Sequence, residues 1–379
     1  MIESKDQENP TETENSPTLS HNEVKNNLKL WRIILPVVIG LVVIIWLIFR
    51  DLKTVDFSIL KFSYLFVLFI CMAFLMMIIR DYGYIIRLRV LSEKKLSLRK
   101  CLRIIMLWEF TSAITPSAVG GTALATIFIW KEGLDIGKST SIVVATSFLD
   151  ELYFSLLFPI VFFVAGSALF PENDSIFYNN LIYFTIAGYI IKLIWTILMG
   201  YSIFVNPAVF SKMIKKIFNI RFIRRWKNAA YNMANGFETS NVELKNKSFK
   251  FWGKAFLSSF FSWTARFLVI NFIFIAFVFI ANSSTDNFFS LGNQLLIFAR
   301  QLTMWIMMLV LPTPGGAGFS EIIFSSYLKD LISLQGFTSF LALAWRLITY
   351  YPYLIIGIFI VPKWIYKHYK IKPKTTKIE

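Results

Sequence analysis

Six apolar runs, each long enough or nearly long enough to cross a lipid bilayer, constrain the fold of this chain more than any other feature. They cover 31–49, 62–79, 141–169, 180–205, 251–281 and 338–361. A hydrocarbon core of about 30 Å is crossed by about 20 apolar helical residues. Only 16% of the residues are charged, whereas soluble globular domains carry about 25%. The sequence therefore predicts an all-α polytopic membrane protein with about six full spans.

Two further apolar stretches are interrupted by similar sequence motifs. Residues 104–130 contain ITPSAVGG at 114–121, and residues 291–333 contain LPTPGGAGF at 311–319. Proline removes a backbone donor and glycine frees the chain to turn, so we expect two broken, re-entrant elements. Their unpaired backbone groups must face protein or a wet cavity, where helix N-termini form anion sites. The alternative is a proline kink or close helix packing on glycine. The candidate residues in the two breaks are Thr115, Pro116, Gly120, Gly121, Pro312, Thr313, Pro314, Gly315, Gly316 and Gly318.

The charges of the chain are distributed unevenly between its loops. Basic residues crowd 80–103, 206–250 and 363–377, whereas 170–179 and 282–290 contain no Lys or Arg. Cytoplasmic loops carry an excess of Lys and Arg, so this pattern predicts cytoplasmic N- and C-termini. The net charge of +16 then points to anionic lipid head groups as partners and not to nucleic acid.

The same pattern divides the chain into segments. We expect residues 1–28 to be a disordered polar tail and residues 29–365 to be the membrane domain. The segment 206–250 forms a basic amphipathic connector, either lying on the membrane surface or simply joining helices. Residues 366–379 form a basic tail.

The order of elements occurs twice. A span, a broken element and a span follow one another in 62–169, and again in 251–361. The loop charges make the first unit enter from the cytoplasmic face and the second from the outer face. This arrangement predicts an inverted repeat, a common basis of secondary transporters.

Ionisable residues inside the apolar stretches are costly and point to function. They are spaced so that several share a helix face with Ser, Thr or Gly four residues away, which predicts that they face the protein interior. One interpretation is structural ion pairing, and the other is that the basic members hold a phosphate head group while a carboxylate pairs with them or takes up a proton. The candidate residues are Asp150, Glu151, Lys192, Arg266, Arg300, Glu321 and Arg346.

The sequence offers little material for catalysis or metal binding. The two histidines, His21 and His368, lie in polar terminal regions, and the two cysteines suggest no disulfide framework. We therefore expect no enzyme activity, no metal and no cofactor.

The broken motifs and their neighbours resemble a known family. ITPSAVGG with WKEGLDIGKST, and LPTPGGAGFSE with LAWRLITYY, are similar to the lysylphosphatidylglycerol synthase transmembrane family, also called flippase-like or UPF0104. The resemblance covers about 30–365 and places Pro312 to Gly318, Glu321 and Arg346 at family positions. Full-length synthases add a soluble catalytic domain, for which we expect no room after the last span.

The resemblance and the repeat together predict a flippase-like protein of the bacterial plasma membrane. It would bind or translocate an anionic phospholipid or a polyprenyl-phosphate-linked lipid, with proteins of envelope biosynthesis as candidate partners. One alternative is a membrane-embedded glycosyltransferase or an accessory subunit of glycolipid or envelope synthesis, with Asp51 and Asp56 in an outer loop. A scaffold that transports nothing is the third.

Overall fold

The computed structural model consists of helices and connecting segments, with no strand among the residues it describes. These residues are 63–115, 117–170, 176–220, 227–280, 289–308, 318–331 and 337–369, together with positions 38, 42, 45, 46, 49, 61 and 224. The first predicted span, 31–49, and the loop that holds Asp51 and Asp56 lie almost entirely outside them.

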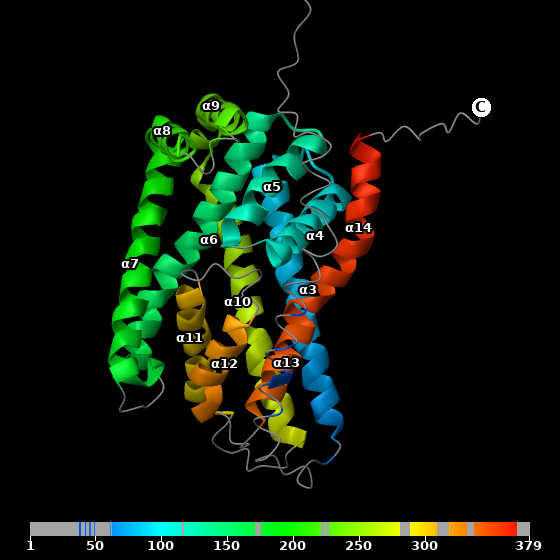
Figure 1. Cartoon of the computed structure of the whole chain (residues 1–379), viewed down its shortest axis with the longest axis vertical. Coiled ribbons are helices and arrows are strands. Elements are labelled where there is room, and N and C mark those ends of the chain that lie inside the picture. The colour runs from blue at the N-terminus through cyan, green and yellow to red at the C-terminus, as the bar shows by residue number, and fades with distance from the viewer. Residues whose placement is uncertain are drawn as a thin grey trace, which may run out of the picture.

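The helices follow one another with short connections (Figure 1). Several begin where a polar side chain caps the first turn: Ser63, Ser97 and Asp135 each accept a hydrogen bond from a backbone N–H two or three residues on. In chain order the elements are α3 (Tyr64–Leu91), α4 (Leu98–Ile114), α5 (Ser117–Lys131), α6 (Ile136–Ala165), η2 (Gly166–Leu169), α7 (Ile176–Phe204), α8 (Ala208–Ile217), α9 (Lys227–Lys245), α10 (Phe249–Ile280), α11 (Leu291–Met308), α12 (Phe319–Leu328), η4 (Lys329–Leu331), α13 (Thr338–Thr349) and α14 (Tyr351–Tyr369).

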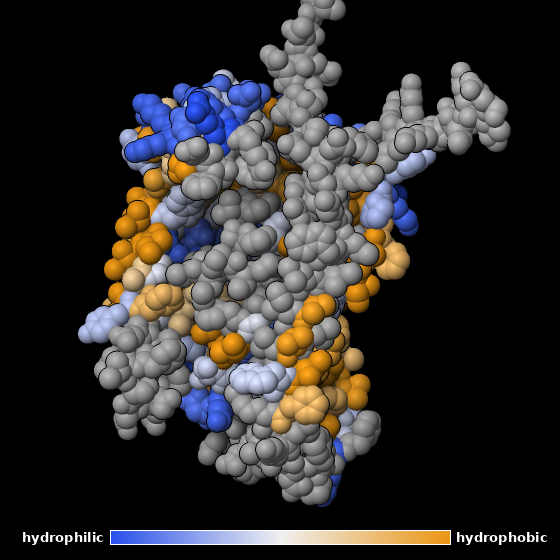
Figure 2. All heavy atoms as spheres, viewed as in Figure 1, coloured by the Kyte–Doolittle hydropathy of each residue, from blue (hydrophilic) through white to orange (hydrophobic). Residues whose placement is uncertain are grey.

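Five stretches of the described chain are long and apolar enough to cross a membrane. They correspond to the predicted spans that follow 31–49, and they confirm the prediction of an all-α polytopic membrane protein. Figure 2 shows hydrophobic residues along the outer sides of α7 and α14, and hydrophilic residues over α8 and α9 at one end. That distribution is the one expected when the long helices face lipid and the connector faces water.

The first interrupted stretch forms a helical hairpin, which we call the first hairpin (α4–α5). The Lys100 ammonium near its start donates to the Glu132 carbonyl oxygen just after its end, at 2.6 Å. The guanidinium of Arg103 pairs with the Glu132 carboxylate at 2.7 Å. The chain therefore enters and returns on the same side, as predicted for a re-entrant element.

The second interrupted stretch also turns back on itself and forms the second hairpin (α11–α12). Arg300 on α11 donates to the Tyr327 carbonyl oxygen at 2.9 Å and pairs with Asp330 at 2.5 Å. Figure 1 places the first hairpin in one half of the molecule and the second in the other.

The long helices that precede the two hairpins, α3 and α10, pack side by side along their lengths. The start of α3 meets the end of α10 where Lys61 N–H donates to the Ile280 carbonyl oxygen at 2.8 Å, so the two helices run in opposite directions. Opposed hairpins beside antiparallel helices are the arrangement expected of an inverted repeat.

Two predicted element boundaries were wrong. The second predicted span, 62–79, ended too early: α3 continues to Leu91, and the arginines near its end pair with carboxylates inside the protein. The last predicted span, 338–361, is not continuous: α13 ends at Thr349 and α14 begins at Tyr351. Pro352 has no N–H, and its ring would collide with the carbonyl of residue 348 in a continuous helix. The kink falls at Tyr350 for this reason.

The connector 206–250 consists of α8 and α9, which pack against each other. The rings of Phe210 and Phe237 lie 4.8 Å apart, and Met213 and Ile214 pack against the core. These contacts turn much of the apolar face of α8 toward the protein, which favours a structural connector over a helix buried in the lipid surface.

Candidate functional site

The lysine predicted at the centre of a span is paired. Lys192 on α7 contacts the Glu151 carboxylate on α6 at 2.6 Å, and both lie on the polar stripes that the sequence predicted. One turn further on, the hydroxyls of Ser155 and Thr196 are 2.9 Å apart. The two stripes therefore face each other between α6 and α7, and this part of the structure matches the ion-pairing interpretation.

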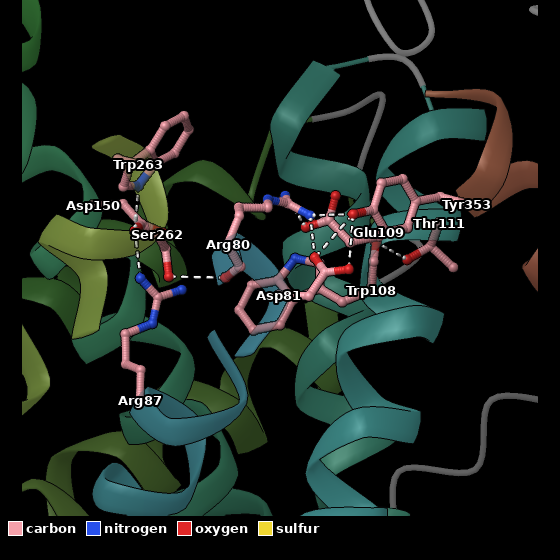
Figure 3. A network of polar contacts seen from close by, with 10 residues as sticks. All are labelled: Arg80, Asp81, Arg87, Trp108, Glu109, Thr111, Asp150, Ser262, Trp263 and Tyr353. Carbon is pink, nitrogen blue, oxygen red and sulfur yellow. Dashed lines mark hydrogen bonds and ion pairs between the residues drawn. The ribbon is translucent and has the colours of Figure 1, made fainter. Parts of the chain in front are cut away.

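Asp150 is held between two side chains, those of Arg87 and Trp263 (Figure 3). It pairs with Arg87 of α3 and accepts a hydrogen bond from the indole N–H of Trp263 on α10 at 2.7 Å. Arg87 also donates to the Ser259 hydroxyl at 2.9 Å. Asp150 thus joins α6 to both long central helices, and its partner is Arg87 and not Arg266 or Arg346.

A second polar cluster in Figure 3 surrounds Arg80 on α3, which is only 2% exposed. Its guanidinium contacts Asp81 at 2.8 Å and Glu109 of the first hairpin at 2.5 Å. The Tyr353 hydroxyl on α14 is 2.9 Å from both Asp81 oxygens. The Arg80 carbonyl oxygen accepts from the Ser262 hydroxyl of α10 at 3.0 Å. The cluster therefore ties the first hairpin to helices of the second repeat.

Arg346 and Glu321 form a buried ion pair in the second half. Arg346 Nε donates to Glu321 Oε1 at 2.8 Å, and the two residues are 5% and 1% exposed. Glu321 also accepts from the Ser320 hydroxyl at 2.9 Å. The guanidinium of Arg346 lies over the Tyr350 ring, whose hydroxyl donates to the carbonyl oxygen of Ala113 at 3.1 Å. A chain of contacts thus runs from the second hairpin to the end of α4.

Arg300 was predicted to bind a ligand, but its hydrogen bonds go to other residues of the protein. Besides its contacts with Tyr327 and Asp330, it donates to the Ala168 carbonyl oxygen of η2 at 2.9 Å. Its donors are directed at the protein, so Arg300 closes the second hairpin and fastens it to the end of α6.

Arg266 stands apart from the other basic residues of the interior. It lies near the middle of α10, and its guanidinium is 4.6 Å from the Trp305 ring centroid and 5.6 Å from that of Trp263. Within the described part of the chain it makes no ion pair, in contrast to Arg80, Arg87, Lys192, Arg300 and Arg346. Arg266 is thus a positive charge near the middle of a long apolar helix, with aromatic neighbours and no paired carboxylate among the described residues.

Arg266 also lines a small, partly open pocket between α10, the second hairpin and α13. The Gln301 amide nitrogen on the wall donates to Asn271 Oδ1 at 3.1 Å and to the Ile297 carbonyl oxygen at 3.2 Å. Both amide hydrogens are thereby used, so the guanidinium of Arg266 is the positive donor group on this lining. The other lining residues are Phe267, Ile270, Met304, Trp305 and Trp345.

The break motifs themselves are only partly described. Thr115 caps the end of α4 in extended conformation and Gly120 lies in α5, where Gly121 approaches Ser112 closely. Gly318 precedes α12 with φ of +82°, a conformation that glycine adopts without strain. The remaining candidates lie outside the described residues: Pro116, Pro312, Thr313, Pro314, Gly315 and Gly316.

Arg80 and Arg87 were not among the predicted site residues. They begin a basic stretch and were therefore assigned to a cytoplasmic loop. Their spacing with Tyr84, however, places all three on one helix face, and the Tyr84 ring is 4.5 Å from both guanidinium carbons. That periodicity, continuing from the apolar run, was the signal that could have extended the span.

Comparison with known proteins places the chain among membrane proteins connected with lipids. A family model described as "Lysylphosphatidylglycerol synthase TM region" matches residues 33–357. A relative from Archaeoglobus fulgidus, described as a UPF0104 membrane protein, is 25% identical over 300 residues, covering 76% of this chain and 84% of its own. The comparison with solved structures found no match.

Proposed function

Because the chain belongs to the family of lysylphosphatidylglycerol synthase transmembrane regions, we propose that it binds the phosphate group of an anionic lipid at Arg266 and carries that group between the leaflets. The observation that carries the proposal is a guanidinium near mid-membrane that lines a pocket and has no carboxylate partner among the described residues. A cation placed there costs several kcal/mol unless an anion accompanies it.

The geometry of Arg266 suits a phosphate. Stacking on Trp305 and Trp263 uses the faces of the guanidinium and leaves its N–H groups to donate in the plane. A planar guanidinium binds two phosphate oxygens at once, which a lysine ammonium does not.

The two hairpins supply the elements that would move. They enter from opposite ends of the molecule, and each is fastened near its base by ion pairs. Transporters with inverted repeats expose a central site alternately by rocking one repeat against the other. The pocket between α10, α11 and α13 lies within the second repeat, where such a movement would open or cover it.

Translocation in liposomes tests the proposal. Purified protein is reconstituted with fluorescent phosphatidylglycerol, phosphatidylcholine or a polyprenyl phosphate, and inward movement is followed by protection from a membrane-impermeant quencher. We expect faster movement of at least one phosphate-bearing anionic lipid than in protein-free liposomes, and at least a tenfold loss in Arg266→Met. Arg266→Lys is expected to retain an intermediate rate because it keeps the charge and loses the bidentate geometry.

Lys254→Met provides the matched control. Lys254 lies on the same helix, about three turns away and exposed, so its removal should leave the rate unchanged. Equal rates for wild type, Arg266→Met and protein-free liposomes with every lipid would overturn the proposal. The lipid arms decide between a phospholipid and a polyprenyl-phosphate-linked substrate.

A further inference from the structure

Two carboxylates share one guanidinium in the Arg80 cluster. Arg80 contacts Asp81 on its own helix and Glu109 on the first hairpin, at 2.8 and 2.5 Å. Tyr353, from α14 of the other repeat, contacts Asp81 but carries no charge in its ordinary form. With both acids ionised, Arg80, Asp81 and Glu109 together carry one excess negative charge.

The surrounding charged groups do not pair with this excess. Arg87 lies across the Tyr84 ring from Arg80 and is already paired with Asp150 of α6. Arg266 of α10 acts on the cluster electrostatically but forms no ion pair with it. Two carboxylates close to one another disfavour ionisation of both, and a proton on one removes the excess charge.

The two carboxylates of the cluster differ in the hydrogen bonds that they accept. Asp81 accepts hydrogen bonds from Arg80 and Tyr353, whereas Glu109 Oε2 accepts none from the described residues. A proton shared by the two carboxylates therefore displaces no hydrogen bond. The side chains of Asp81 and Glu109 are 19% and 21% exposed, whereas Arg80 is buried.

We propose that the Asp81–Glu109 pair is a proton-binding site whose occupancy is coupled to anion binding at Arg266. The proton site stands on the cluster alone, whereas the coupling rests on the proposed function. The positive charge of Arg266 offsets the excess negative charge of the pair while its pocket is empty. An anion that neutralises Arg266 removes this compensation and strengthens proton binding, and by linkage a bound proton strengthens anion binding to the same extent.

The proton site is tested directly by infrared spectroscopy of the full-length protein in lipid nanodiscs. Wild type is expected to show the C=O stretch of a protonated carboxyl group at neutral pH, and to lose it when the pH is raised. Glu109→Gln and Asp81→Asn should both lack this band, because each leaves one carboxylate for one guanidinium. Glu132→Gln is the matched control, since Glu132 already pairs one-to-one with Arg103 and its removal should leave the band intact.

The coupling is tested by calorimetric titration with a short-chain phosphatidylglycerol from neutral pH upward, across the range in which the carboxyl band is lost. The wild-type affinity should fall as the pH rises through that range, by up to about tenfold per pH unit. Glu109→Gln should bind with little pH dependence.

The two tests separate the proposals from each other. A carboxyl band that is absent from wild type, or that survives in both Asp81→Asn and Glu109→Gln, overturns the proton site even if lipid is bound and moved. A pH-independent affinity in wild type overturns the coupling. A band that behaves as expected without any lipid binding confirms the proton site and counts against the proposed function instead.

Discussion

The hydroxyl of Tyr350 donates a hydrogen bond to the carbonyl oxygen of Ala113 at 3.1 Å, which joins the kink between α13 and α14 to the end of α4. Ala113 lies in the last turn of α4, where carbonyl groups have no partner within the helix. The contact therefore satisfies a buried acceptor and connects the two repeats. It exists because Pro352 interrupts the last span and turns Tyr350 out of a continuous helix.

Tyr350→Phe should lower the free energy of unfolding by about 1–3 kcal/mol, because it leaves the Ala113 carbonyl unsatisfied in the interior. Unfolding in mixed micelles, followed by circular dichroism, measures the change. Tyr366→Phe is the control, since Tyr366 is 69% exposed and its hydroxyl makes no contact of this kind in the described chain. Equal stability of the two variants would mean that water or lipid replaces the bond at no cost.

Arg346→Met should destabilise the protein by about 3–5 kcal/mol, because it leaves the Glu321 carboxylate buried without its cation. Replacing both residues, as Arg346→Met with Glu321→Gln, should recover part of the loss. Lys363→Met, on an exposed position of α14, serves as the control for removing a positive charge. The double-mutant cycle in the unfolding free energy gives the coupling, and additive effects of the two single changes would contradict it.

Gly83→Ala should destabilise the crossing of α3 and α10. A Cβ at Gly83 would lie 2.1 Å from the Ser262 hydroxyl oxygen and 2.9 Å from the Ser258 carbonyl oxygen, so the helices must separate. The expected cost is about 1–3 kcal/mol. Gly253→Ala is the matched control, because no heavy atom lies within 4 Å of its added methyl. There the higher helix propensity of Ala should stabilise by up to about 1 kcal/mol. Melting temperatures in detergent should therefore shift in opposite directions, and shifts of the same sign would contradict the crossing.

Glu93 should contribute to stability in a pH-dependent way. It follows α3 and contacts Lys138 of α6 at 2.8 Å and Lys247 at 2.6 Å, which brings three parts of the chain together. Hydrogen bonds from Lys138 and Lys247 lower the pKa of Glu93 from 4.5 to about 2. A carboxyl group with a lowered pKa in the folded state stabilises above its unfolded pKa, and this contribution is lost as the pH falls toward the folded pKa.

Glu93→Gln should accordingly lower the melting temperature at neutral pH. Its difference from wild type should shrink as the pH falls from about 4.5 toward about 2. Glu238→Gln on α9 is the control, because Glu238 makes no ion pair among the described residues. If the difference in melting temperature between Glu93→Gln and wild type did not change with pH, the charge of Glu93 would not be its cause.

Much of the fold follows from local features of the sequence. Apolar length predicted the spans, and the proline–glycine motifs predicted two hairpins, because the membrane penalises any unpaired backbone and these signals act within one segment. The spacing of Ser147, Glu151 and Ser155 likewise placed Glu151 on an inward face, where it meets Lys192. The C-terminal end of α3 was missed because it depends on ion-pair partners elsewhere in the chain. The kink at Tyr350 was missed because it depends on a single proline within an apolar run.

Which charged side chains pair with each other depends on the tertiary structure. From the sequence, Asp150 could pair with Arg266 or Arg346. In the structure Asp150 pairs with Arg87, and Arg346 pairs with Glu321. Arg266 lies beside tryptophans because α10 turns that face toward α11, and it forms no ion pair with the described residues. Helical periodicity states which side chains share a face of one helix, whereas the partner across the interface depends on how helices from both repeats pack against each other.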